Sequence, residues 1–358
     1  NTAMGELKTN RLIDKLGEAD TFLSKYRHYR RVDKKKAWKA FCLRVEANPP
    51  KRINWQIVFR YAAILLLPIS IVAICLMLLA DPVEQKISES LAAVGPGTSQ
   101  AILVLSDGNE ISLDSTVTNR LAVGGSAVAA VTGSHISYQA NSQATSMQYN
   151  TLLTKQGGEY RIVLEDGTKV HLNAASQLRY PVVFTNKERV VHLQGEAYFE
   201  VAPDKARPFY VVTDHMKIRQ YGTAFNVNAY PGSSTEVVLV RGSIGVTVGD
   251  KERTLAPGQL AKIHAGSKLL SIKEVDTESY VAWNEGRFFF DNQSLRDIAN
   301  VLSRWYNIEI QFARGDIQYL HFTGSLDRYD TIEPIIQAIS RAANVKVEMK
   351  DHILYISK

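Results

Sequence analysis

The feature that most constrains this chain is an uninterrupted apolar stretch near its beginning. Residues 61–80, YAAILLLPISIVAICLMLLA, contain no Asp, Glu, Lys or Arg. A helix rises about 1.5 Å per residue, so a stretch of this length matches the roughly 30 Å hydrocarbon core of a bilayer. A buried core helix usually keeps a polar stripe, and a signal peptide begins nearer the N-terminus. We therefore expect one transmembrane helix within residues 55–80.

The charges on either side of this stretch give the chain a direction. Residues 1–60 hold 15 Lys and Arg against 6 Asp and Glu, whereas the other 298 residues hold 27 against 30. By the positive-inside rule, the N-terminus is expected in the cytoplasm and residues 81–358 outside it. Pro68 and Ser70 weaken helical hydrogen bonding inside the stretch, so we expect an intramembrane protease to cut there.

Residues 1–54 show the spacing of short helices. Apolar residues recur every three or four positions, as in Trp38, Phe41 and Val45, and the remaining positions are strongly basic. Helices this short bury little surface alone, which favours a protein partner. A solvated segment attracted to anionic lipid is the alternative interpretation.

Residues 81–285 change to a period of two. ILVLSDGNEISLD (102–114) and IVLEDGTKVHLN (162–173) repeat one unit, in which two alternating strands flank an Asp-Gly pair. We expect type I′ hairpin turns at both pairs, since Gly and Asp tolerate positive φ. Many further short strands follow, which predicts an all-β sandwich, barrel or short solenoid.

Residues 286–358 alternate strand and helix. SLRDIANVLSRWYNIEI (294–310) and TIEPIIQAISRAANVKV (331–347) align at an offset of 37, which pairs Asn307 with Asn344. This pattern indicates a duplicated helix–strand unit, whose apolar helix faces must cover a small sheet.

The predicted fold class is therefore multi-domain. We expect a short α-helical cytoplasmic segment (1–54), one transmembrane helix (55–80), an all-β solenoid- or sandwich-like domain (81–285) and a C-terminal α+β domain of βαβ repeats (286–358).

The residues give little support for an enzyme. The sequence contains no HExxH, CxxC, GxSxG or phosphate-binding loop, and we expect no metal and no cofactor. His171 and His192 are expected at exposed strand positions. Glu196 and Glu200 would share a strand face about 13 Å apart, which is wide for paired acid–base catalysis and favours structural hydrogen bonds or salt bridges.

Four motifs follow the apolar stretch in order: DGTKVHLNAASQLRYP (166–181), GEAYFEVAPDKARPFYV (195–211), YGTAFNVNAY (221–230) and VRGSIGV (240–246). Together they resemble the FecR-type transmembrane anti-sigma regulators of Bacteroides-like bacteria. The last 70 residues resemble the small domain shared by secretins and TonB-dependent receptors, and VDKKKAWKAF (32–41) looks like the end of the family's cytoplasmic helical domain.

This resemblance implies a signal transducer in the inner membrane. The cytoplasmic helices, with Trp38, Phe41 and Val45, would bind an extracytoplasmic-function (ECF) sigma factor. The periplasmic part would contact the N-terminal signalling domain of a TonB-dependent outer-membrane transporter, and an intramembrane protease would release the sigma-bound tail. The resemblance also implies single-turnover self-cleavage between Gly222 and Thr223, and no direct contact with nucleic acid.

Two other functions stay open at this point. The +9 charge of residues 1–60 would suit a membrane-tethered DNA-binding regulator, although no helix-turn-helix pattern is evident there. An anchored envelope enzyme or adaptor is the other alternative.

Overall fold

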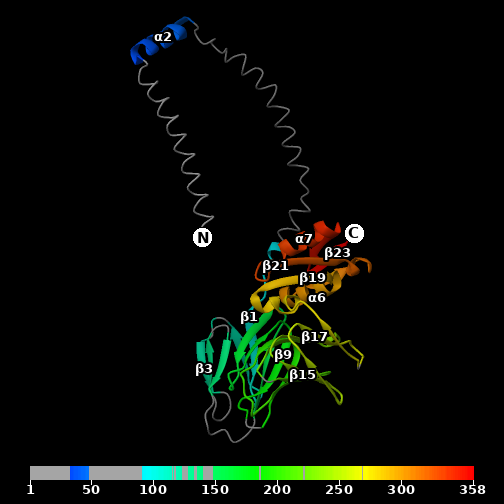
Figure 1. Cartoon of the computed structure of the whole chain (residues 1–358). Coiled ribbons are helices and arrows are strands. Elements are labelled where there is room, and N and C mark those ends of the chain that lie inside the picture. Colours follow the sequence, from blue (N-terminus) through cyan, green and yellow to red (C-terminus); the bar gives the residue numbers. More distant parts are fainter. Residues whose placement is uncertain are drawn as a thin grey trace, which may run out of the picture. The chain divides into compact units, whose positions relative to one another are not determined.

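The computed structural model describes residues 33–47 and 91–358, apart from 115, 117, 123–127, 133–134, 140–147, 185–186, 221 and 268. The chain divides into two compact units, residues 1–80 and 81–358 (Figure 1). In the first unit the described residues form helix α2 (Lys34–Ala47). Asp33 begins this helix, because its Oδ1 accepts hydrogen bonds from the backbone N–H of Lys35 at 3.1 Å and of Lys36 at 3.4 Å.

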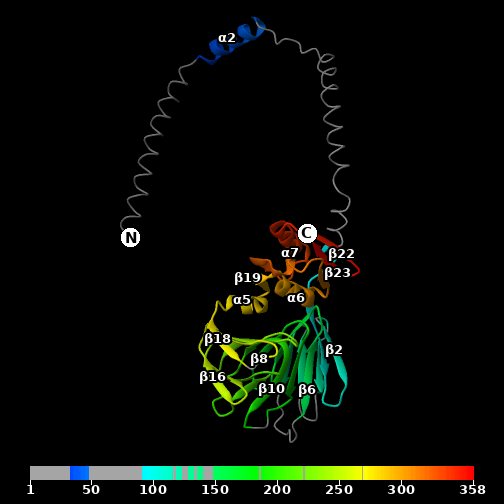
Figure 2. The same cartoon turned by 90° about the vertical axis from the view of Figure 1, so that its right-hand side faces the viewer.

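Strands β1 to β18 of the second unit form two sheets that are joined through strand β10 and through the pairing of the start of β1 with β7 (Figure 2). The first sheet has the order β2 (Glu110–Asp114), β1 (Thr98–Val104), β6 (Tyr149–Thr154), β9 (Ser176–Pro181), β10 (Arg189–Glu200), β11 (Phe209–Val212), β12 (Lys217–Gln220), β15 (Ile244–Val248) and β16 (Lys251–Leu255). The second has the order β3 (Thr118–Ala122), β4 (Val128–Thr132), β5 (His135–Gln139), β7 (Gly158–Val163), β8 (Lys169–Leu172), β10, β13 (Ala224–Ala229), β14 (Thr235–Arg241), β17 (Gln259–Ile263) and β18 (Leu270–Glu274).

Strand β10 passes from one sheet to the other at Gly195. Its first half pairs with β9 and β11, and its second half pairs with β8 and β13. Gly195 has φ +94°, and a Cβ there would lie 2.7 Å from the Cα of Ser176. Only glycine fits this change of sheet, because a side chain would both strain the backbone and overlap a neighbouring strand.

The core of the two sheets is built from alternating apolar positions. β6, for example, alternates half-buried and buried residues along its whole length. Three phenylalanine rings pack in a row at the centre of the core. The ring centroids are 5.2 Å apart for Phe199–Phe225 and 6.5 Å apart for Phe199–Phe209. All three rings are fully buried, so they contribute much of the apolar area that holds the sheets together.

The two Asp-Gly hairpins form, but not with the predicted type I′ geometry. Gly108 and Gly167 have φ of +88° and +84°, whereas neither Asp107 nor Asp166 has positive φ. Each aspartate instead accepts a hydrogen bond at 3.0 Å from the backbone N–H two residues later. The turns are therefore Asx-stabilised, with glycine taking the left-handed position alone.

The C-terminal elements form two small sheets and two main helices. Their bounds are α5 (Glu278–Val281), η1 (Ala282–Glu285), β19 (Arg287–Ser294), α6 (Leu295–Tyr306), β20 (Glu309–Phe312), η2 (Ile317–Tyr319), β21 (His321–Asp327), α7 (Glu333–Ala343), β22 (Lys346–Lys350) and β23 (Ile353–Ser357). β19 pairs antiparallel with β21, whereas β23 pairs parallel with β20 and antiparallel with β22.

The duplicated unit has the same helix end in both copies. α6 is followed by Asn307 at φ 52° and α7 by Asn344 at φ 51°, and each asparagine donates its backbone N–H to the carbonyl of the serine four residues earlier. Asparagine suits this left-handed cap better than other non-glycine residues, which explains why the residue recurs at the offset of 37.

The predicted fold class is wrong. The described residues are mostly strand with few helices, and none of their helices is long and apolar enough to cross a membrane. The transmembrane helix predicted within 55–80 lies outside the described residues. In the C-terminal region, β19 and β20 belong to different sheets, so each repeat does not form a βαβ unit of its own. The sequence repeat indicated the order of elements, but strand pairing depends on contacts between the copies.

Replacing Gly195 by alanine tests the change of sheet. We expect G195A to lose about 1–3 kcal/mol of unfolding free energy from the left-handed backbone alone, and more from the overlap with Ser176. G232A is the matched control, because Gly232 has φ +75° but a Cβ there meets no heavy atom of the described residues within 4 Å. Urea unfolding of both variants measures the difference, and equal losses would contradict the steric role.

Candidate functional site

The Gly222–Thr223 peptide bond lies where the chain crosses between the two sheets. β12 ends at Gln220 in the first sheet, and β13 begins at Ala224 in the second. Gly222 has φ +108°, a conformation that side-chain-bearing residues rarely adopt. The glycine in an otherwise strand-rich segment is therefore explained by the crossing.

Neighbouring groups hold this bond firmly. The Oε1 atom of Gln220 accepts hydrogen bonds from the backbone N–H of Gly222 and, at 3.4 Å, from the hydroxyl of Thr223. The Thr223 carbonyl accepts from the N–H of Val201 at 3.0 Å. On the other side, a Cβ at Gly242 would lie 2.5 Å from Thr223 Cγ2 and 3.0 Å from the Gly222 carbonyl oxygen. A second glycine thus lets the bend between β14 and β15 pack directly against the bond.

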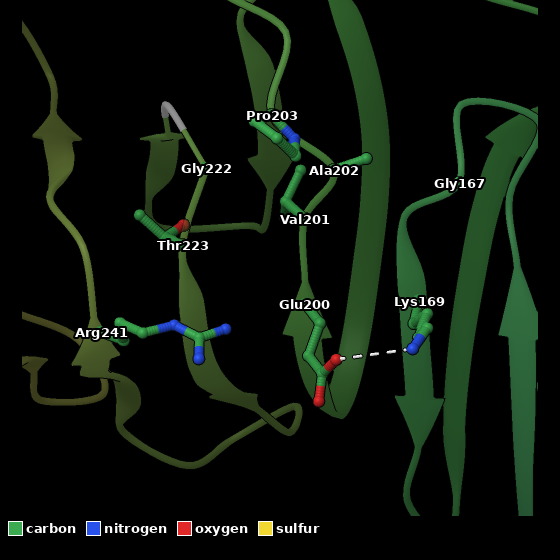
Figure 3. Close-up of a pocket in the computed structure, with 9 residues that line it drawn as sticks. All are labelled: Gly167, Lys169, Glu200, Val201, Ala202, Pro203, Gly222, Thr223 and Arg241. Carbon is green, nitrogen blue, oxygen red and sulfur yellow. Dashed lines mark ion pairs between the residues drawn. The ribbon is translucent and has the colours of Figure 1, made fainter.

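A pocket of about 310 Å³ opens beside this bond (Figure 3). Its charged lining residues are Lys169 and Glu200, which form an ion pair at 4.0 Å, and Arg241. The volume is sufficient for several water molecules. His215, the histidine nearest to the bond in sequence, is exposed between β11 and β12 and does not line the pocket.

The predicted sigma-binding residues lie on α2. Trp38 and Phe41 are 68% and 57% exposed, and their rings stack with centroids 5.7 Å apart. Val45 follows one turn later on the same helix. Large aromatic side chains exposed together on a basic helix are typical of a surface that binds a partner.

The prediction that His171 is exposed is wrong, whereas His192 is exposed as expected. His171 is 5% exposed because the C-terminal elements cover its strand. Its Nδ1 lies 2.8 Å from Asn284 Oδ1, and its ring packs 4.8 Å from that of Trp283. The alternating pattern of β8 showed which face His171 occupies, but not that a distant segment would cover that face.

His171 belongs to a buried polar cluster, here called the interface network, formed by Glu159, His171, Asn173, Glu196 and Arg328. Arg328 Nη2 lies 2.6 Å from Asn173 Oδ1 and 3.3 Å from Glu159 Oε2. The guanidinium carbon of Arg328 stands 3.6 Å from the centre of the Trp305 ring. The network joins the sheets to the C-terminal elements through charge-assisted hydrogen bonds and a cation–π contact.

Glu159 and Glu196 respond differently to burial. Burial raises the pKa of Glu159, but its hydrogen bond with His171 and the charges of His171 and Arg328 outweigh this, so the net pKa is lowered. Burial raises the pKa of Glu196, and the hydrogen bonds donated by Asn226 and Asn173 only partly oppose that rise. Glu196 is thus structural, as its distance from Glu200 predicted, while Glu159 is held as a carboxylate.

Sequence reasoning missed Glu159 and Arg328. Arg328 and its partner Asn173 are separated by 155 positions, and an arginine after a strand is usually a solvated residue. In a single sequence, nothing indicates that a lone charged residue is buried. The contact between Arg328 and Asn173 could therefore be identified only from the structure.

Comparison with known families finds two matching regions. The family model described as FecR protein matches residues 150–245, and the one described as FecR, C-terminal, matches residues 287–356. The chain thus carries both FecR regions, in order. This confirms the resemblance to FecR-type anti-sigma factors that the motifs predicted.

Solved structures agree with this assignment. Two crystal structures of a candidate anti-sigma factor from Parabacteroides distasonis are 27% and 26% identical to this chain, each with a TM-score of 0.55. The similarity covers 58% and 59% of this chain and 98% and 99% of the solved ones. No curated protein matches the chain.

The lowered pKa of Glu159 predicts how the interface network responds to acid. A carboxylate with a depressed folded-state pKa stabilises the fold above its unfolded pKa of about 4.3, and this contribution is lost as pH falls through the folded-state pKa. E159Q should therefore be less stable than wild type at pH 7, and the difference should shrink below about pH 4. Urea unfolding between pH 7 and pH 3 measures it, with E200Q as the exposed control. A difference that persists at pH 3 would argue against a charged Glu159.

Proposed function

We propose that this FecR-family chain is an anti-sigma regulator that binds an ECF sigma factor in the cytoplasm. Its periplasmic part receives a signal from the N-terminal signalling domain of a TonB-dependent outer-membrane transporter. The observation that carries this proposal is the presence of both FecR regions in order, together with the likeness to the P. distasonis candidate anti-sigma factor.

The exposed face of α2 is the proposed sigma-binding surface. Trp38 and Phe41 present a stacked aromatic pair, which suits the apolar centre of a protein interface better than a solvated surface. The lysines around them favour an acidic rim on the partner, since opposite charges steer association.

Truncating this pair tests the proposal. W38A and F41A should each weaken sigma-factor binding by about 10-fold or more, because buried aromatic anchors dominate interface energies. K39A is the control on the same helix. The measurement is titration of the full chain with each ECF sigma factor of the source organism. Salt-dependent binding of duplex DNA without any sigma binding would instead favour the tethered DNA-binding alternative.

We place the chain at the inner membrane, with the N-terminus in the cytoplasm and residues 81–358 in the periplasm. The excess of Lys and Arg in residues 1–60 supports this orientation. In this arrangement an intramembrane protease acts within residues 61–80 after the exterior part is removed, and it frees the sigma-bound tail.

The C-terminal sheets suit recognition of the transporter. Among the described strands β21 pairs on one side only, with β19, which leaves an edge for a strand of the partner. Tyr319 and Leu320, directly before β21, are 63% and 40% exposed and add apolar contact area beside this edge.

In the proposed function the chain also cleaves its own peptide bond between Gly222 and Thr223. The Thr223 hydroxyl oxygen attacks the Gly222 carbonyl carbon, the C–N bond breaks, and the hydroxyl proton ends on the released Thr223 amine. Water then hydrolyses the resulting ester to give a Gly222 carboxylate and a free Thr223 hydroxyl. The positive φ of Gly222 and the tight packing around the bond support this reaction. Breaking a strained peptide bond costs less free energy, because the strain in the backbone is released.

Two variants at Thr223 distinguish the role of its hydroxyl in cleavage from the role of its side chain in packing. T223V keeps the contact between Cγ2 and Gly242 but lacks the nucleophile, so it should stay one band on a denaturing gel. T223S retains the hydroxyl and should still give two fragments. Wild type that remains whole for days at neutral pH would show that the bond is only a structural crossing.

A further inference from the structure

The proposed scission would divide the interface network between two chains. Glu159, His171, Asn173 and Glu196 belong to the N-terminal fragment (residues 1–222), whereas Arg328 belongs to the C-terminal fragment (residues 223–358). Every contact that Arg328 makes with Glu159 and Asn173 therefore crosses the cut.

Further contacts surround this charged centre and also cross the cut. Tyr329 donates its hydroxyl to Glu159 Oε1 at 2.8 Å, and Tyr230 donates to the Ala174 carbonyl at 2.7 Å. The backbone N–H of Gly157 donates to the Arg304 carbonyl at 2.8 Å. The Trp305 ring packs so closely on Gly97 that a Cβ there would approach it to 2.7 Å.

Strand pairing and the shared apolar core, including the stacked rings of Phe199 and Phe225, also cross the cut. β13 pairs with the second half of β10, and β12 pairs with β15. These ladders consist of backbone hydrogen bonds whose groups can bond to water when the strands part, so each contributes modestly to the net stability. The buried charges differ in that removing only one of them leaves its partner buried without a counter-charge while the fragments stay together.

We infer that the polar end of the N-terminal fragment, formed by Glu159, His171 and Asn173, is a docking surface for the C-terminal fragment, with Arg328 as its central anchor. The inference rests on the proposed self-cleavage for its biological setting. It means that, beside the apolar core and the strand pairs that the fragments share, a buried arginine of one fragment paired with a buried carboxylate of the other helps to keep them together after scission.

Arg328 is the anchor because its loss cannot be compensated within the fold. The residue is 1% exposed, and Glu159 is 7% exposed. Removing the guanidinium leaves Glu159 in a buried site with its Arg328 contact gone, and truncating one partner of such a pair mainly accelerates dissociation. The backbone contacts of Arg328 with Gly286 and Trp305 do not depend on the side chain, so R328M keeps them.

The experiment uses the full chain with an N-terminal affinity tag and a site-specific protease sequence inserted between Gly222 and Thr223. The protein is immobilised, nicked to completion, and washed in buffer with increasing urea, and the release of the C-terminal fragment is followed on denaturing gels. Nicked wild type should retain the fragment, whereas R328M should release it at least about 30-fold faster.

R287A is the matched control. Arg287 is also an arginine of the C-terminal fragment, but it is 40% exposed and its ion pairs with Glu278 and Glu285 lie within that fragment. Its release rate should equal that of wild type. The double variant E159Q/R328M should lose less than the sum of the single variants, because the two side chains act as a pair.

Y329F keeps the test falsifiable if R328M fails to fold before nicking. It removes one hydroxyl from Glu159 and should give a smaller but measurable acceleration. Immediate release of the fragment by nicked wild type, or equal retention by Y329F and every folded R328M sample, would overturn the inference. Because the protease makes the cut, an uninserted wild type that never cleaves itself would refute only the proposed self-cleavage.

Discussion

The contact between the two sheets and the C-terminal elements is organised around one buried arginine. Arg328 is placed against Trp305 and within reach of Asn173 and Glu159, in a site closed to solvent. Burial lowers its pKa, and the acidic neighbours oppose that shift. A buried charge is tolerated only when its hydrogen-bonding and ionic partners are in place. The sheets and the C-terminal elements therefore keep one mutual position, since any other would leave the charge unpaired.

The same two-sheet architecture produces the candidate cleavage site. β10 serves both sheets by turning at Gly195, so the strands that pair with its two halves belong to different sheets. β12 and β13 are consecutive in sequence but lie in different sheets, and the chain between them must cross. Gly222 makes that crossing possible through its positive φ. The position of the candidate bond is thus a consequence of topology, and the proposed cleavage would use strain that the fold already requires.

Sequence reasoning was accurate where the pattern is local. The period-two strands, the duplicated helix–strand unit that pairs Asn307 with Asn344 and the unusual glycine at 222 all depend on neighbours within a few residues. Sequence reasoning did not predict which strands pair or which polar side chains are buried. Nothing near His171 shows that Trp283 will cover it, and the C-terminal repeat does not reveal which strands pair. Such features arise from contacts between segments far apart in the sequence, which a single sequence does not record.

A cut at the crossing between sheets changes the fold little, because each sheet retains hydrogen bonds across it. β12 still pairs with β15 in one sheet, and β13 still pairs with β10 in the other. What the cut removes is connectivity, which holds two surfaces at an effective concentration on the order of millimolar for a short link. After scission, association depends on the affinity of the fragments themselves. The contacts of Arg328 would then acquire a role that they do not have in the intact chain, since they would contribute to the affinity that keeps the two fragments together.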